Sequence, residues 1–168
     1  MNPSLFSYIA WFFVLIGAQV LVCNHIHLLG YAMPMIYVYF LMILPGNISR
    51  CGLLILAFIL GLIVDMFSKT PGMATSAIVF TALLRPLVLM IFAPSERSDG
   101  VFYPSVRTME FGGFFRYALT ISLLQTTTFY VIEAFSFFHL ATLFWNILSS
   151  TLLTTLLILA LEMLRNKR

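Results

Sequence analysis

Charged residues are scarce in this 168-residue chain. Asp, Glu, Lys and Arg together make up 9% of it, whereas 61% of the residues are hydrophobic. A water-soluble domain of this size needs far more charge, so the composition excludes that class and indicates an integral membrane protein. The net charge of +3 comes without any basic stripe interleaved with aromatic residues. No nucleic-acid binding is therefore predicted.

Cysteine is scarce too, because Cys23 and Cys51 are the only two. They fall at opposite ends of the expected bundle, so we expect free thiols and no disulfide. Cys23, His25 and His27 could be interpreted as a metal site, but no further ligands lie nearby in the sequence. We therefore predict neither a metal site nor a cofactor.

The sequence also lacks the patterns of a membrane enzyme. It contains no His-Glu-x-x-His, no paired aspartates in the middle of a span, and no serine with His and Asp nearby. A non-enzymatic protein is expected. Residues 1–4 carry no Lys or Arg, so no cleavable signal peptide is predicted and the first helix is expected to remain.

Long apolar runs are what the chain does have, and each can cross a hydrocarbon core that takes roughly 20 helical residues. They predict an all-α bundle of six transmembrane helices that forms a single domain over residues 1–168. The predicted spans are residues 5–22, 28–44, 52–67, 74–92, 114–137 and 140–164. Pro34 is expected to bend the second span.

Lys and Arg are unevenly distributed between the two ends of the predicted bundle. If the amino terminus is cytoplasmic, Lys69 alone falls in an outer loop and Arg85 falls within a span. The cytoplasmic segments then hold Arg50, Arg97, Arg107, Arg116, Arg165, Lys167 and Arg168. The positive-inside rule therefore predicts that both termini are cytoplasmic.

Two basic or mixed-charge segments are expected on the cytoplasmic side. Residues 165–168 form a basic tail, which suits anionic membrane lipids. Residues 93–113 alternate charged and apolar side chains, a pattern that predicts an interfacial loop on the inner leaflet. That loop is either a simple connector or a docking segment for a partner.

The candidate functional residues begin at the joint between the third and fourth spans. Gly61 and Asp65 lie four residues apart and share one helix face, and Pro71 with Gly72 predicts a tight turn before the next helix. Such a face can receive a neighbouring helix or a ligand closely. Alternatively, Asp65 meets water at the outer boundary and caps the turn before Lys69.

Two further charged positions are candidates. Arg85 precedes Pro86 within the fourth span, and Glu133 lies near the outer end of the fifth. Arg85 either follows its helix to the inner headgroups or faces the interior, bound to a partner or to carbonyls freed by Pro86 or Pro34. Because Arg85 lies deeper than Glu133, a direct bridge between them is not assured.

Hydroxyl residues are concentrated in the last two spans. They are either contact residues between helices or, in the alternative, the lining of a substrate site. Gln19 in the first span is expected to make the same kind of interhelical contact. The hydroxyl residues are Thr126, Thr127, Thr128, Ser149, Ser150, Thr151, Thr154 and Thr155.

Several of these blocks resemble the MreD family of bacterial rod shape-determining membrane proteins. The resemblance lies in Leu44-Pro45 at the end of the second span, Gly61-Leu62-Ile63-Val64-Asp65, Thr70-Pro71-Gly72-Met73 and Arg85-Pro86. Chain length, six-span layout and basic tail agree with that family over the whole chain. The family's Pro-Leu-Gly-like turn is shortened here, since Pro71 is followed directly by Gly72.

The resemblance implies a non-enzymatic scaffold of the cell elongation machinery in the bacterial inner membrane. Its implied partners are a MreC-like periplasmic protein, a MreB-like cytoskeletal protein, and the elongation glycosyltransferase and transpeptidase of peptidoglycan synthesis. The helical layout is also similar to that of the substrate-binding subunits of energy-coupling-factor vitamin transporters. A ligand-binding transporter subunit is therefore the alternative.

Overall fold

The computed structural model describes residues 5–21, 33–68, 70–93, 102–134 and 140–166, and every regular element in these ranges is helical. The predicted all-α fold is thus confirmed for the described residues. Three helical stretches are long and apolar enough to cross a membrane. The helices are α1 (Leu5–Leu21), α2 (Val38–Ile43), α3 (Arg50–Ser68), α4 (Met73–Phe92), α5 (Val106–Ala134) and α6 (Leu140–Asn166).

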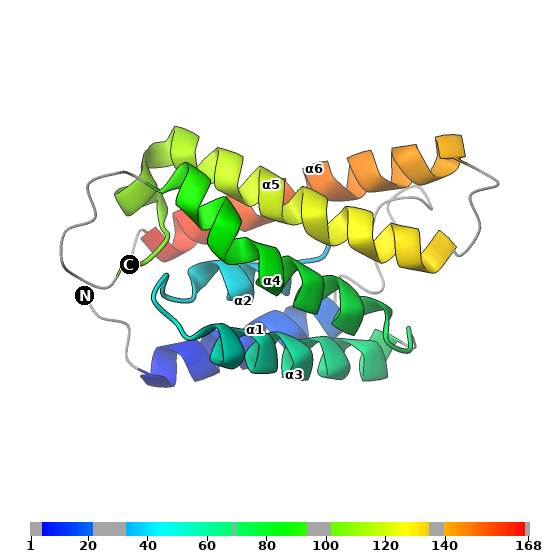
Figure 1. The fold of residues 1–168 in the computed structure, drawn as a ribbon, viewed down its shortest axis with the longest axis horizontal. Helices are drawn as coiled ribbons and strands as arrows, with labels where there is room; N and C mark the ends of the chain where they lie inside the picture. Colours follow the sequence, from blue (N-terminus) through cyan, green and yellow to red (C-terminus); the bar gives the residue numbers. More distant parts are fainter. Residues whose placement is uncertain (1–4, 22–32, 69, 94–101, 135–139, 167–168) are drawn as a thin grey trace.

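The helices lie along one long axis and alternate in direction (Figure 1). The start of α1, the connection from α2 to α3, the start of α5 and the end of α6 lie at one end of the bundle. The turn between α3 and α4 and the end of α5 lie at the other. α3 packs against α4, α4 against α5, and α5 against α6. α2 lies in the middle of the bundle and contacts α1 and α5.

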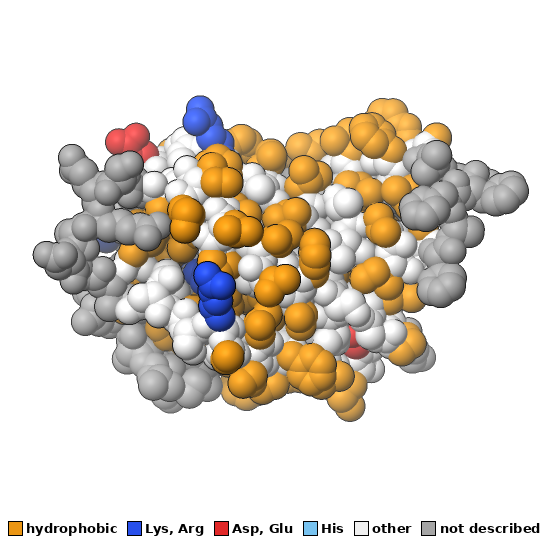
Figure 2. All heavy atoms as spheres, viewed as in Figure 1, with side chains coloured by type: hydrophobic (Ala, Val, Ile, Leu, Met, Phe, Trp, Pro, Cys, Tyr) orange, Lys and Arg blue, Asp and Glu red, His pale blue; other side chains and the backbone are white. Residues whose placement is uncertain are grey.

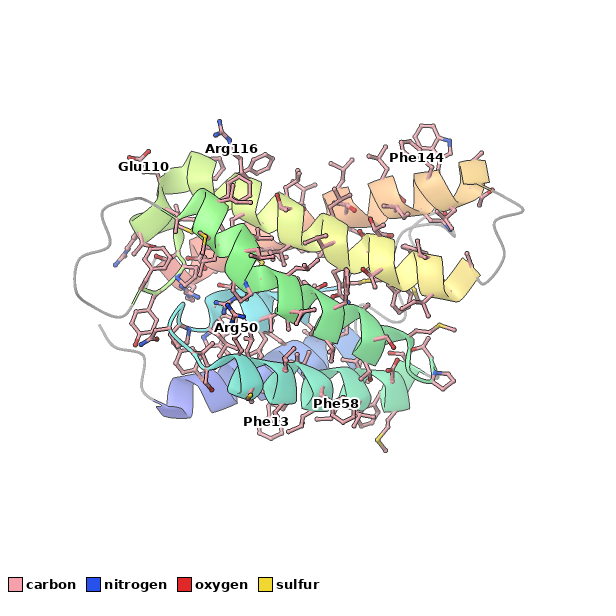
Figure 3. The ribbon with its side chains drawn as sticks, viewed as in Figure 1. Phe13, Arg50, Phe58, Glu110, Arg116 and Phe144 are labelled. Atoms are coloured by element: carbon pink, nitrogen blue, oxygen red, sulfur yellow. The ribbon has the colours of Figure 1, made fainter. Side chains whose placement is uncertain are left out.

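The surface of the bundle is apolar and its interior contains polar groups. Figure 2 shows hydrophobic side chains spread over the face formed by α3, α4 and α5. Phe13, Phe58 and Phe144 point outward from three different helices (Figure 3). Among the described residues, thirteen polar or charged side chains are buried, including Gln19, Asp65, Arg85, Gln125 and Glu162. This distribution suits a surrounding of lipid, because interhelical hydrogen bonds then join helices whose outer faces are apolar.

The second predicted span is not a continuous helix. Within residues 28–44 the structure describes 33–44, where only the six residues of α2 are α-helical, residues 33–35 have no regular structure and residues 36–37 form a turn. Pro34 explains part of this departure, because proline has no N–H and disfavours the helical conformation in the residue before it. The prediction of a merely bent helix was therefore wrong at 33–37. Every residue of α2 is buried.

The predicted loop at 93–113 is also partly helical where it is described. A short turn at 106–109 is followed by Glu110, whose φ of 57° and ψ of 165° interrupt α5. The long part of α5 then continues to Ala134, so this helix begins before the predicted span boundary at 114. The remaining predicted spans agree with α1, α3, α4 and α6 to within a few residues.

Candidate functional site

Asp65 is buried and caps the start of the neighbouring helix. Its Oδ1 accepts hydrogen bonds from Thr70 Oγ1 and Ala74 N, both at 2.9 Å. Its Oδ2 accepts from Thr75 N at 2.9 Å and Thr75 Oγ1 at 2.6 Å. The first backbone N–H groups of a helix have no partner within that helix, and the N-cap of α4, Gly72, has no side chain to supply one. The carboxylate from α3 therefore does what a capping residue does within a single helix.

Gly61 allows α3 and α4 to approach closely. A Cβ atom at this position would lie 2.5 Å from Thr75 Cα and 2.9 Å from Ile78 Cγ2, so any side chain would force the helices apart. This contact is one turn from Asp65 on the same face, as the sequence predicted. Gly72 has a φ of 81°, a conformation that favours glycine, and it follows exposed Pro71 in the turn.

Arg85 points into the bundle and binds the end of the broken second span. Its Nη2 donates to the carbonyl oxygen of Leu44 and lies 3.5 Å from that of Met42, while its Nε donates to Tyr117 Oη at 3.2 Å. The side chain is 2% exposed, so it does not extend to the headgroups. The carbonyls it binds are those left without partners at the end of α2, and not those freed by Pro86 or Pro34.

Glu133 stands apart from the other two charged candidates. It is exposed near the end of α5, and the structure shows no ion pair between it and Arg85. Asp65 is hydrogen-bonded within the hairpin of α3 and α4, and Arg85 to α2 and α5. The three charged residues predicted as candidates thus lie apart from one another and do not form one site. Pro86 lies inside α4 and leaves the helix continuous.

The segment 33–37, which precedes α2, is held by side chains from distant helices. Gln19 donates through Nε2 to the carbonyl oxygen of Pro34 at 3.0 Å and accepts from Ile36 N at 2.8 Å. Met33 N donates to Ser150 Oγ at 3.0 Å, and Met35 N donates to Thr154 Oγ1 at 3.1 Å. Buried backbone polar groups outside a helix need hydrogen-bond partners from the protein around them, and these three side chains supply them here.

Some hydroxyl residues of α5 and α6 contact one another or the second predicted span, whereas Thr128, Ser149 and Thr155 donate to carbonyl oxygens of their own helix. Thr126 and Thr151 hydroxyls are 2.6 Å apart, and those of Tyr130 and Ser150 are 2.8 Å apart. Gln125 makes two further long-range contacts, because it donates to Tyr37 Oη at 2.7 Å and accepts from Thr81 Oγ1 at 2.9 Å. The contacts of Thr126, Ser150, Thr151 and Thr154 agree with the interpretation of the hydroxyls as interhelical contacts.

The sequence-based reasoning missed Glu162, a carboxylate of α6 that is 1% exposed. Its Oε2 accepts from Tyr39 Oη at 2.6 Å, and its Oε1 accepts from Val106 N at 3.3 Å and lies 3.3 Å from Arg165 Nη2. It thereby joins α2, the start of α5 and the end of α6. An acidic residue three positions before Arg165 in an apolar helix was the available signal.

Metal binding is not indicated in the part of the chain that the structure describes. No group of three His, Cys, Asp or Glu side chains that could hold an ion occurs there. The cluster of Cys23, His25 and His27 lies outside the described residues, whereas Cys51 is an exposed free thiol. No protein family, curated protein or solved structure matches this chain.

Proposed function

We propose that this protein is a MreD-like scaffold of the bacterial cell elongation machinery, embedded in the inner membrane and without catalytic activity. It would cross the membrane six times with both termini in the cytoplasm. Its role would be to dock a MreC-like partner and to help organise peptidoglycan synthesis.

The observation that carries this proposal is that two buried charged side chains, Asp65 and Arg85, bind the ends of the chain's own helices. Asp65 caps α4, and Arg85 caps α2, so both hold the chain's own helices in place. Both residues belong to the blocks that resemble MreD. A rigid bundle with an apolar exterior is what a scaffold needs when it presents fixed helix faces to the transmembrane helix of a partner.

The proposed topology is supported by where the described arginines lie. Arg50 and Arg116 are both in the half of the bundle where α1 begins and α6 ends (Figure 3). Arg107 follows the first residue of α5, and Arg165 is in the last turn of α6. Positive charge gathered at the end that contains both outermost helix termini favours a cytoplasmic location for that end.

The further partners follow from the same resemblance. The cytoplasmic end would meet a MreB-like protein and anionic lipids, and the membrane-embedded faces would meet the elongation glycosyltransferase and transpeptidase. Exposed apolar side chains on α3 and α6, including Met66, Phe67, Phe144 and Trp145, are available for such contacts within the membrane.

The test is affinity purification of the tagged full chain in mild detergent, with mass spectrometry of the proteins that co-purify. Recovery of a single-span periplasmic coiled-coil protein together with cell-wall synthases is expected. Depletion of the protein in a rod-shaped host should also produce round cells. If these proteins do not co-purify and depletion does not change the cell shape, the proposal is overturned.

The alternative is a ligand-binding subunit of a vitamin-type transporter. The observation that favours it is the discontinuous second span, because unwound segments in transporters commonly form binding sites near the middle of the membrane. In the same purification, the transporter alternative predicts recovery of a pair of transport ATPases. The pairing of Gln19, Ser150 and Thr154 with this segment favours the scaffold.

A further inference from the structure

We propose that residues 102–109, called the strap below, form a hinged cover over the carboxyl end of α2, held closed by Glu162 and opening about Glu110. This inference does not depend on the proposed cellular role. It rests on a buried latch, a strained hinge and a rigid turn between them.

The strap lies against the end of the second span. Gly46 N, just past α2, donates to the carbonyl oxygen of Phe102 at 2.8 Å. A Cβ atom on Gly46 would lie 3.4 Å from Phe102 Cδ1, so the ring and this turn are in contact. Pro104 and Met109 are buried by the same packing. The strap therefore lies beside the turn that follows Leu44, whose carbonyl oxygen binds Arg85.

The latch is the carboxylate of Glu162. It accepts hydrogen bonds from Tyr39 of α2 and from Val106 N, the first backbone N–H of the turn in the strap. Glu162 is one of two buried carboxylates among the described residues, and it links the strap to α2 through one side chain. Neutralising or removing this carboxylate would weaken both contacts together.

The turn in the strap is capped by its own residues. Ser105 N donates to Thr108 Oγ1 at 3.0 Å, and Thr108 N donates to Ser105 Oγ at 3.3 Å. This reciprocal pair is a capping box, which fixes the turn without help from the rest of the bundle. The strap can thus move as a unit instead of unravelling.

The hinge is Glu110, the one described residue other than glycine with positive φ. Its φ of 57° and ψ of 165° lie in a region that is almost restricted to glycine. Strain of this kind persists only where surrounding contacts impose it, and here Glu162 and Gly46 hold the strap closed. A Cβ atom on Gly112, two residues on, would meet nothing within 4 Å, so the chain after the hinge is unobstructed.

Hydrogen–deuterium exchange of the full chain in lipid nanodiscs tests this proposal. In Glu162→Gln we expect the amides of 103–109 to exchange about tenfold faster, because a charged hydrogen-bond acceptor is lost. Amides of α3 and α4 serve as the internal reference and should keep their rates. Glu133→Gln, which neutralises an exposed carboxylate near the far end of α5, should change neither region.

Two more variants keep the test decisive if Glu162→Gln folds poorly. Tyr39→Phe should accelerate exchange in the strap, since it removes the latch contact to α2. Glu110→Gly should slow it, because glycine relieves the strain of the closed state. Unchanged strap exchange in Tyr39→Phe and Glu110→Gly, or equal acceleration of the strap and of the α3–α4 reference, would overturn the proposal.

Discussion

The hairpin of α3 and α4 and the broken second span differ in how their unpaired backbone groups find hydrogen-bond partners. Both contain backbone groups that lack partners inside their own helix. In the hairpin, one carboxylate, Asp65, satisfies two backbone N–H groups at once. Around the second predicted span the work is shared by four side chains from three helices, each of which bonds one or two backbone groups. They are Gln19, Arg85, Ser150 and Thr154. The hairpin therefore concentrates its stability in one residue, whereas the second span distributes it.

Replacing Asp65 is the strongest way to challenge this contrast. In Asp65→Ala two buried N–H groups and two hydroxyls lose their acceptor, and we expect a loss of about 3 kcal/mol in unfolding free energy. Unfolding by dodecyl sulfate in mixed micelles, followed by circular dichroism, measures it. Membrane insertion should be unaffected because the basic residues are unchanged, while abundance or partner recovery should fall.

The control for that experiment is Glu133→Ala, which removes an exposed carboxylate at the same end of the bundle. It should unfold like the parent protein to within about 0.5 kcal/mol. If Asp65→Ala and Glu133→Ala are equally stable, the carboxylate does not hold the hairpin and the contrast fails.

Gly61→Ala tests the close packing that accompanies the cap. The added methyl group would overlap the backbone of Thr75, so the helices must separate, with an expected loss of about 2 kcal/mol. Gly17→Ala is the matched control, since a Cβ atom there would meet nothing within 4 Å. Thermal unfolding in detergent should place Gly61→Ala well below Gly17→Ala, and the reverse order would contradict the packing argument.

Gln19→Leu probes the most connected tether of the second span. The substitution keeps the volume but leaves Pro34 O and Ile36 N without their partner, with an expected loss of about 1.5 kcal/mol. Exchange of the amides at 36–40 should accelerate, while exchange within α3 and α4 stays unchanged. Acceleration confined to α3 and α4 would show that Gln19 acts elsewhere.

Thr154→Val sharpens the comparison because it removes one of the several side chains that bond the backbone of the second predicted span. It keeps the side chain's shape but deletes the acceptor of Met35 N, with an expected loss of about 0.6 kcal/mol, the average for such bonds in membranes. The double variant Thr154→Val with Asp65→Ala should be additive within about 0.5 kcal/mol. A loss from Thr154→Val as large as that from Asp65→Ala would mean that the second span also depends on single residues.

The sequence predicted the hairpin well because its signals are local. Gly61, Asp65, Pro71 and Gly72 lie within twelve residues, and helix geometry alone puts the first two on one face. The sequence predicted the hydrogen-bond partners of the Asp65 carboxylate only in part. Asp65 faces the neighbouring helix, and it caps that helix instead of the turn before Lys69.

The interior of the bundle was less predictable because its contacts join residues far apart in the chain. Arg85 could turn toward lipid or toward the interior, and only the packed position of α2 decides between them. Pro34 predicted only a bend, whereas the backbone at Met33 and Met35 is non-helical and bonds to Ser150 and Thr154. Glu162 stood out little in an apolar helix because its partners, Tyr39 and Val106, come from other elements.

The separation of these contacts along the chain sets an order of events during synthesis. Asp65 reaches its partners within ten residues, so the hairpin can close as soon as the start of α4 has been translated. Met33 and Met35 must wait for Ser150 and Thr154, which are made 117 and 119 residues later. At ordinary ribosome speeds that delay is roughly ten seconds. The second span is thus an unfinished element for most of translation, and the last helix to emerge completes it.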